Sequence, residues 1–255
     1  MAAGLGSTTM NDPDAPEPRI GDAFGELLRA LHAGSDVLGV IERDDGMVDP
    51  HDARIYFAEP AEWEDLDRTA CARAVGRVLD VGCGPGRHSL HLQKAGFDVT
   101  AIDPAAGACQ VAQARGVRTV HQMTVEQVPE LGQRFDTFLL LGNNLGLLGS
   151  ASHAPVVLDA LARSAATGAR VLATGTDPYH TEDPVHLAYQ ARNRQRDRMA
   201  GQLRLRVRYR HLAGPWFDYL LCSHDELADL VDGSPWRVAG FQDEGPSYLV
   251  ELRLR

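Results

Sequence analysis

The spacing of apolar residues predicts alternating strands and helices from residue 77 onward. Short apolar runs suited to buried strands lie near 77–81, 98–102, 117–120, 135–141 and 170–174. Segments with helical spacing or helix-boundary signals lie between them, near 87–95, 105–115, 125–130 and 154–165. Such alternation is typical of parallel strands joined by helices that cover both faces of one sheet.

The pattern changes after residue 175. A helix is predicted over 184–198, and the next segment alternates apolar residues with arginines from Leu203 to Arg210, as in a strand with two unlike faces. A capping box opens a helix over 224–231, and 236–242 and 247–254 suit a closing hairpin. We predict an α/β fold: a doubly wound, Rossmann-like, mostly parallel seven-stranded sheet with a C-terminal antiparallel hairpin and a small substrate-cap elaboration.

Composition divides the chain into three parts. Residues 1–19 have few large apolar groups and predict a flexible leader. Phe24, Leu27, Leu28 and Leu31 have helical spacing, and we predict an N-terminal helical lid over 20–70. The main domain is predicted over 71–255, with the cap inserted at about 176–222.

Charge and cysteine usage narrow the class of protein. The chain has a net charge of −10, whereas proteins that bind DNA or RNA usually present a positively charged surface to the phosphates. We therefore expect no nucleic-acid partner. No apolar run approaches the roughly 20 residues of a membrane helix, and the first residues lack the pattern of a secretory signal. The 4 cysteines are scattered. We therefore expect a cytoplasmic protein without a metal site or a membrane partner.

The most informative motif is LDVGCGPG at residues 79–86, where a predicted strand turns into a helix. Such a turn presents backbone N–H groups and a helix N-terminus to a ligand. A carboxylate at Asp80 would face the anion of a pyrophosphate, and Arg87 stands where a dinucleotide-binding turn has its third glycine. The turn thus suits a nucleoside that carries an amino acid better than a dinucleotide.

The end of the next strand supports this interpretation. Asp103 follows the apolar run at 98–102. An acid at this strand tip is placed to accept two hydrogen bonds from a ribose diol. The order and spacing of the two motifs together predict a nucleoside site.

Residues 77–175 resemble the class I S-adenosylmethionine-dependent methyltransferases of the small-molecule type. The resemblance lies in the glycine motif, in Asp103 and in the fourth strand over 134–141. It implies S-adenosylmethionine as cofactor. It also implies cofactor contacts at Asp80, Gly82, Gly84, Gly86, His88, Asp103, Pro104, Met123, Thr124, Val125, Leu141, Gly142 and Asn143. Thr124 stands where the family often has an acid for the adenine amino group.

Residues for the acceptor and for proton transfer are predicted from their place after strands. Proton-acceptor candidates at the rim of the sheet are His180, Asp177 and Tyr179, with His153 and His121 behind them. Substrate-contact candidates are Tyr56, Asn144, Arg206, Arg208 and Trp216. Most of the arginine row also suits a solvated sheet face, and the aromatic residues also suit a core.

We therefore predict a methyltransferase that methylates an oxygen or nitrogen atom of a small molecule, such as a specialised metabolite, and acts as a monomer or homodimer. Alternatives are a methyltransferase of protein or RNA, a nucleotide-dependent oxidoreductase, and a regulator that only binds S-adenosylmethionine. Asp80 and Arg87 argue against the oxidoreductase.

Overall fold

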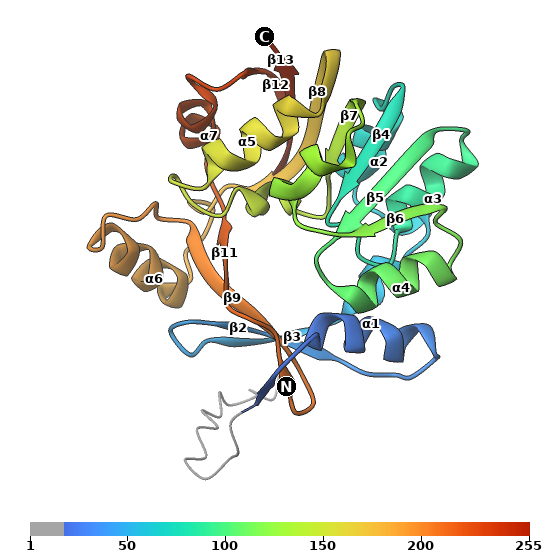
Figure 1. Ribbon diagram of the computed structural model, residues 1–255. Helices are drawn as coiled ribbons and strands as arrows, with labels where there is room; N and C mark the ends of the chain where they lie inside the picture. Colours follow the sequence, from blue (N-terminus) through green and yellow to red (C-terminus); the bar gives the residue numbers. More distant parts are fainter. Residues whose placement is uncertain (1–17) are drawn as a thin grey trace.

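A mostly parallel sheet of seven strands forms the main body of the computed structural model, which describes residues 18–255 (Figure 1). Its strand order is β12-β13-β8-β7-β4-β5-β6. The strands are β4 (Arg77–Val81), β5 (Asp98–Asp103), β6 (Thr119–Gln122), β7 (Phe135–Leu140), β8 (Ala165–Thr176), β12 (Trp236–Glu244) and β13 (Ser247–Leu254). Only β13 runs opposite to the other strands and pairs antiparallel with both β12 and β8, which confirms the predicted Rossmann-like α/β class and its closing hairpin.

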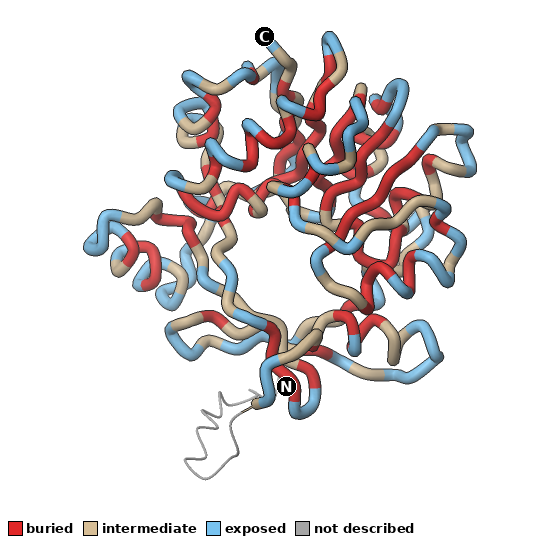
Figure 2. Tube along the Cα trace, in the orientation of Figure 1, coloured by how far each residue is buried: buried red, intermediate tan, exposed pale blue. Residues whose placement is uncertain are grey.

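Helices cover both faces of this sheet. They are α2 (Asp65–Ala72), α3 (Arg87–Lys94), α4 (Ala106–Ala114), η3 (Val125–Leu131), η4 (Asn144–Leu148), α5 (Ala154–Arg163) and α7 (His224–Val231). Phe138 and Trp236 are fully buried beneath α5, where the Trp236 indole donates a 2.8 Å hydrogen bond to the Leu158 carbonyl. Leu66 and Leu92 fill the core on the other face, so the central strands are buried along almost their whole length (Figure 2).

A second sheet is assembled from two distant parts of the chain. It contains β1 (Arg19–Ile20), β2 (Gly39–Arg43), β3 (Val48–His51), β9 (Gln202–Tyr209), β10 (Leu212–Ala213) and β11 (Phe217–Leu220). β9 is its centre. β2 pairs with β9 so that Ile41 lies opposite Val207, and β11 and β10 also pair with β9.

The N-terminal region is only partly helical. Helical turns form at α1 (Ala23–His32), η1 (Ala53–Phe57), η2 (Pro60–Glu62) and α2. Residues 39–51, expected within a helical lid, form the β2–β3 hairpin instead, because β9 offers them a strand with which to pair. The predicted leader lies almost entirely in residues 1–17, outside the described part of the chain.

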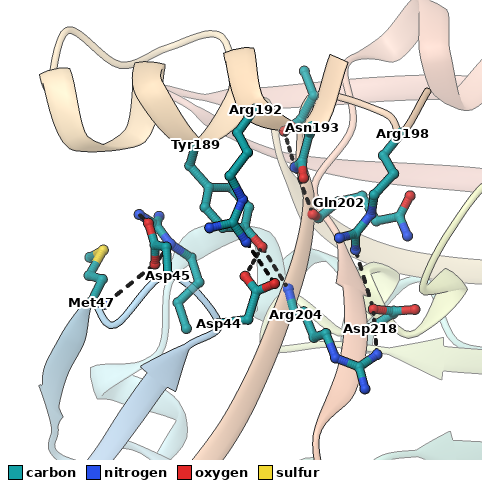
Figure 3. A network of polar contacts seen from close by, with 12 residues as sticks. Asp44, Asp45, Met47, Tyr189, Arg192, Asn193, Arg198, Gln202, Arg204 and Asp218 are labelled. Carbon is teal, nitrogen blue, oxygen red and sulfur yellow. Dashed lines mark hydrogen bonds and ion pairs between the residues drawn. The ribbon is translucent and has the colours of Figure 1, made fainter. Parts of the chain in front are cut away.

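Helix α6 (Pro184–Arg194) is fastened to the second sheet by a polar network (Figure 3). The Tyr189 hydroxyl and the Arg192 guanidinium both donate to Asp44, at 2.6 and 2.8 Å. The Asn193 amide donates to the carbonyls of Ala200 and Gln202. The helix ends at Arg194, four residues before its expected end.

Among residues 18–255, no helix is both long and apolar enough to cross a bilayer.

Helix α1 is docked onto the main domain through its contact with α4. One Asp22 oxygen accepts from the backbone N–H of Gly25, and the other accepts from that of Gly107, at 2.8 and 2.7 Å. The two helices approach so closely that a Cβ atom added at Gly107 would lie 2.5 Å from the Gly25 Cα atom. Glycine is therefore required at this crossing.

The substitution Gly107→Ala should destabilise the protein by about 2 kcal/mol, because the overlap with Gly25 outweighs the gain of about 1 kcal/mol in helix propensity. Urea unfolding measures the change. Gly240→Ala is the control, since a Cβ atom there meets nothing within 4 Å. Equal stability of the two variants would show that α1 does not depend on this crossing.

Candidate functional site

A cavity of about 1270 Å³ lies between the two sheets. One wall is formed by the carboxyl ends of β4, β5 and β7, and we call this the cofactor end. The opposite wall is formed by β2, β9 and β11, and we call this the acceptor end. The carboxyl edge of a parallel sheet is where α/β folds bind ligands.

The glycine turn, residues 82–86, enters the cavity from the end of β4. Gly82, Gly84 and Gly86 all have positive φ, at 69°, 53° and 80°, a conformation that favours glycine. The space beside Gly84 is open, with no atom within 4 Å of an added Cβ. The Asn144 amide donates to the carbonyls of Val81 and Gly82, at 3.1 and 3.0 Å, so this predicted substrate residue supports the turn.

Asp80 lies beneath the turn rather than in the cavity lining. Its side chain is buried and accepts a 2.6 Å hydrogen bond from the Ser89 hydroxyl. Burial raises the pKa of this carboxyl. The geometry thus gives Asp80 a place between β4 and α3, and its contact with a cofactor stays a prediction.

Asp103 lies at the tip of β5 and lines the cavity with Pro104. One oxygen accepts from the backbone N–H of Gly84 at 2.9 Å, and the other accepts from that of Ala105 at 2.8 Å. Burial raises the pKa of the carboxyl to about 6, although both N–H groups lower it. Asp103 joins the glycine turn to the next strand, and each oxygen keeps a lone pair for a ligand hydroxyl.

A buried ion pair missing from the sequence analysis lies behind the turn. One Asp67 oxygen is 2.7 Å from the Arg87 guanidinium and 3.2 Å from the His88 imidazole, and the other accepts from the Gly142 N–H at 3.3 Å. Arg87 also donates to the Ile55 carbonyl. Burial alone raises the pKa of the Asp67 carboxyl, but contacts with His88 and Arg87 hold it below its usual range. No motif marks Asp67, because its partners are distant in the sequence.

The remaining predicted cofactor residues divide between the cavity and the core. His88, Thr124, Val125, Leu141, Gly142 and Asn143 line the cavity. Met123 lies outside the lining and packs against the main core. Asn143 has a positive φ of 69°, its backbone N–H donates to the Thr174 hydroxyl, and its carbonyl accepts from Tyr219.

The proton-acceptor candidates after β8 lie outside the cavity lining. Tyr179 is exposed and donates to Glu226 at 2.6 Å, Asp177 accepts from the Tyr179 N–H, and His180 is exposed. Their catalytic role stays a prediction without geometric support. The histidines that do line the cavity are His51, His88 and His153.

Some of the predicted substrate residues line the cavity and others lie outside it. Tyr56 lines the cavity and packs edge-on against Phe24, with ring centres 5.7 Å apart. Arg206, Arg208 and Trp216 lie outside the lining. Arg206 makes two hydrogen bonds with Glu42 and lies over the Trp216 ring, so these groups bind one another on the outer face of the second sheet.

The sheet order, the glycine turn after β4 and the acid at the tip of β5 together define the class I methyltransferase architecture. Residues 78–168 match the family described as a methyltransferase domain. This match confirms the resemblance of that part of the chain to the class I S-adenosylmethionine-dependent methyltransferases found in the sequence.

Individual relatives match part of the chain. The chain is 43% identical over 70 residues to a ubiquinone biosynthesis O-methyltransferase of Azorhizobium caulinodans, covering 26% of this chain and 28% of the relative. It is 31% identical over 112 residues to a glycine/sarcosine N-methyltransferase of Aphanothece halophytica, covering 42% and 40%. These matches span less than half of either relative.

A solved structure is similar over a greater length. The S-adenosylmethionine-dependent methyltransferase of Bacteroides fragilis, in complex with S-adenosyl-L-homocysteine, has a TM-score of 0.78 and 24% identity, covering 91% of this chain and 94% of that one. At this identity the likeness establishes the shared fold.

The substitution Asp67→Asn should destabilise the protein by about 3 kcal/mol at pH 7, because it leaves the buried Arg87 charge without a partner. The loss should shrink as pH falls through the lowered pKa of Asp67, where the wild-type carboxylate is itself protonated. Urea unfolding measures both effects. Asp65→Asn on the same helix is the control, because its ion pair with Arg68 is exposed.

Proposed function

We propose that the protein transfers a methyl group from S-adenosylmethionine to an oxygen or nitrogen atom of a small molecule held between the two sheets. The observation that carries this proposal is one continuous cavity that joins the glycine turn and Asp103 at the cofactor end to an apolar wall at the acceptor end. A small acceptor in this cavity would lie within reach of the transferred group.

The residues at the cofactor end fit this cofactor. Asp103 would accept from the ribose diol, and the open backbone at Gly84 would admit the nucleoside. Thr124 and Val125 would border the adenine. The guanidinium of Arg87 would attract the carboxylate of the methionine part.

Bound S-adenosylmethionine supplies a methyl group on a positively charged sulfur, which leaves with the electron pair of the broken carbon–sulfur bond as the acceptor's lone pair bonds to carbon. The chain's contribution is to orient the reactants and to exclude water. An acceptor that carries a proton also needs a group to take it.

His153 and Glu126 are the best-placed pair for this proton. Both line the cavity, and the His153 Nε2 atom lies 2.8 Å from a Glu126 oxygen. Burial alone raises the pKa of Glu126, but contacts with Thr124, its own backbone and His153 hold it below the usual range, which keeps the carboxylate charged. A carboxylate at Nε2 leaves Nδ1 as the proton acceptor and stabilises the imidazolium that forms.

Calorimetric titration tests the proposed cofactor. We expect S-adenosylhomocysteine to bind the wild-type protein and NADH not to bind. Tight NADH binding without S-adenosylhomocysteine binding would instead support an oxidoreductase. Transfer of labelled methyl from S-adenosylmethionine to protein or RNA, with none to small molecules, would contradict the acceptor class.

The pH dependence of this titration tests the role of Asp103. Its pKa of about 6 lies above the ordinary 3.8, so the carboxylate forms only as pH rises through 6. If the ionised form holds the ribose, S-adenosylhomocysteine should bind about tenfold more weakly at pH 5 than at pH 7. Asp103→Asn should bind weakly at both values, and an unchanged pH profile in this variant would contradict the role.

The substitution His153→Asn should lower kcat by about 100-fold or more, because it removes the proton acceptor, while S-adenosylhomocysteine affinity stays within about twofold. Methyl transfer to an accepted substrate measures kcat. His180→Asn is the control and should retain wild-type kcat. The opposite result would place the proton acceptor after β8, as the sequence analysis expected.

A further inference from the structure

We propose that the acceptor is a lipophilic molecule without an anionic group. This inference rests on the proposed function and concerns the acceptor end of the same cavity. It follows from the side chains that the second sheet turns toward the cavity and from those that it turns away.

The apolar face of β9 forms the acceptor wall. Leu203, Leu205 and Val207 line the cavity, because alternate residues of a strand share one face. The neighbouring strands add Ile41, which pairs with Val207, and Phe217, which pairs with Leu205. These residues form a continuous apolar surface suited to a lipophilic ring or chain.

The arginines of β9 alternate with these apolar residues, lie outside the cavity lining and are paired with acidic residues. Arg206 and Arg208 both contact Glu42, at 2.8 and 3.3 Å. Arg204, and Arg198 just before β9, lie 3.6 and 3.4 Å from Asp218, a carboxylate residue of the cavity lining (Figure 3). These guanidinium groups are therefore engaged with carboxylates and do not line the cavity.

The cavity has little positive charge of its own. Within residues 18–255, Arg87 is the only lysine or arginine that lines it, and Arg87 lies at the cofactor end in its ion pair with Asp67. Residues 1–17 contain no lysine, arginine or histidine in their sequence. A basic side chain from that segment therefore cannot complete the site.

Two further ionisable sites in the cavity lining, His51 and the His153–Glu126 pair, do not favour an anion. Burial lowers the pKa of His51, which leaves it uncharged at neutral pH. His153 faces the Glu126 carboxylate, so the pair brings no net positive charge. A carboxylate or phosphate on the acceptor would lose its hydration and find no counter-ion, whereas a neutral ring loses little.

Two probes of equal ring size test this preference: 2-naphthol, neutral at pH 7, and 2-naphthoate, an anion. Fluorescence titrations are run with and without saturating S-adenosylhomocysteine. We expect the wild-type protein to bind 2-naphthol at least about tenfold more tightly than 2-naphthoate. Equal or tighter binding of 2-naphthoate would overturn the inference, as would absence of 2-naphthol binding.

The substitution Leu205→Lys places a cation on the acceptor wall and should tighten 2-naphthoate binding by about tenfold or more while weakening that of 2-naphthol. Leu205→Met is the matched control and should keep the wild-type preference. An unchanged 2-naphthoate affinity in the lysine variant, with S-adenosylhomocysteine binding intact, would show that Leu205 does not face the acceptor. If the wild-type protein does not bind S-adenosylhomocysteine, the proposed cofactor is wrong. This result distinguishes failure of the proposed function from failure of the inference about the acceptor.

Discussion

The hydrogen bond from the Gly84 N–H to the Asp103 carboxylate is the interaction on which the cofactor end depends. It joins the turn after β4 to the tip of β5, at 2.9 Å and away from solvent. The turn can reach this position only because Gly82, Gly84 and Gly86 adopt positive φ. Burial also raises the pKa of Asp103 to about 6. The carboxylate that accepts this hydrogen bond is therefore protonated in mildly acidic solution.

A second constraint is the alternation of side chains along β9. Because successive residues point to opposite faces, one strand supplies an apolar wall to the cavity and an arginine row to the outer surface. The acidic partners of that row come from β2 and β11, so the pairing that builds the sheet also keeps its charges out of the cavity.

Asp67 links the N-terminal region to the site. Buried ion pairs are costly to desolvate, and this one is offset by several contacts, to Arg87, His88 and the Gly142 N–H. These contacts hold the start of α3 and the end of β7 in a fixed relation. The residues before β4 therefore form part of the site's frame, in addition to covering it.

The sequence by itself determined the main sheet, the glycine turn and Asp103, because local periodicity and turn chemistry fix strands, helices and the residues at their ends. It did not reveal the β2–β3 hairpin, since the strand that stabilises it lies more than 150 residues away, as the pairing of Ile41 with Val207 shows. Nor did it separate His153 from His180: both follow elements at the same rim, and only tertiary packing turns one toward the cavity. Which face of β9 meets the cavity was likewise decided by its partners in space, because alternation defines two faces without saying which is buried.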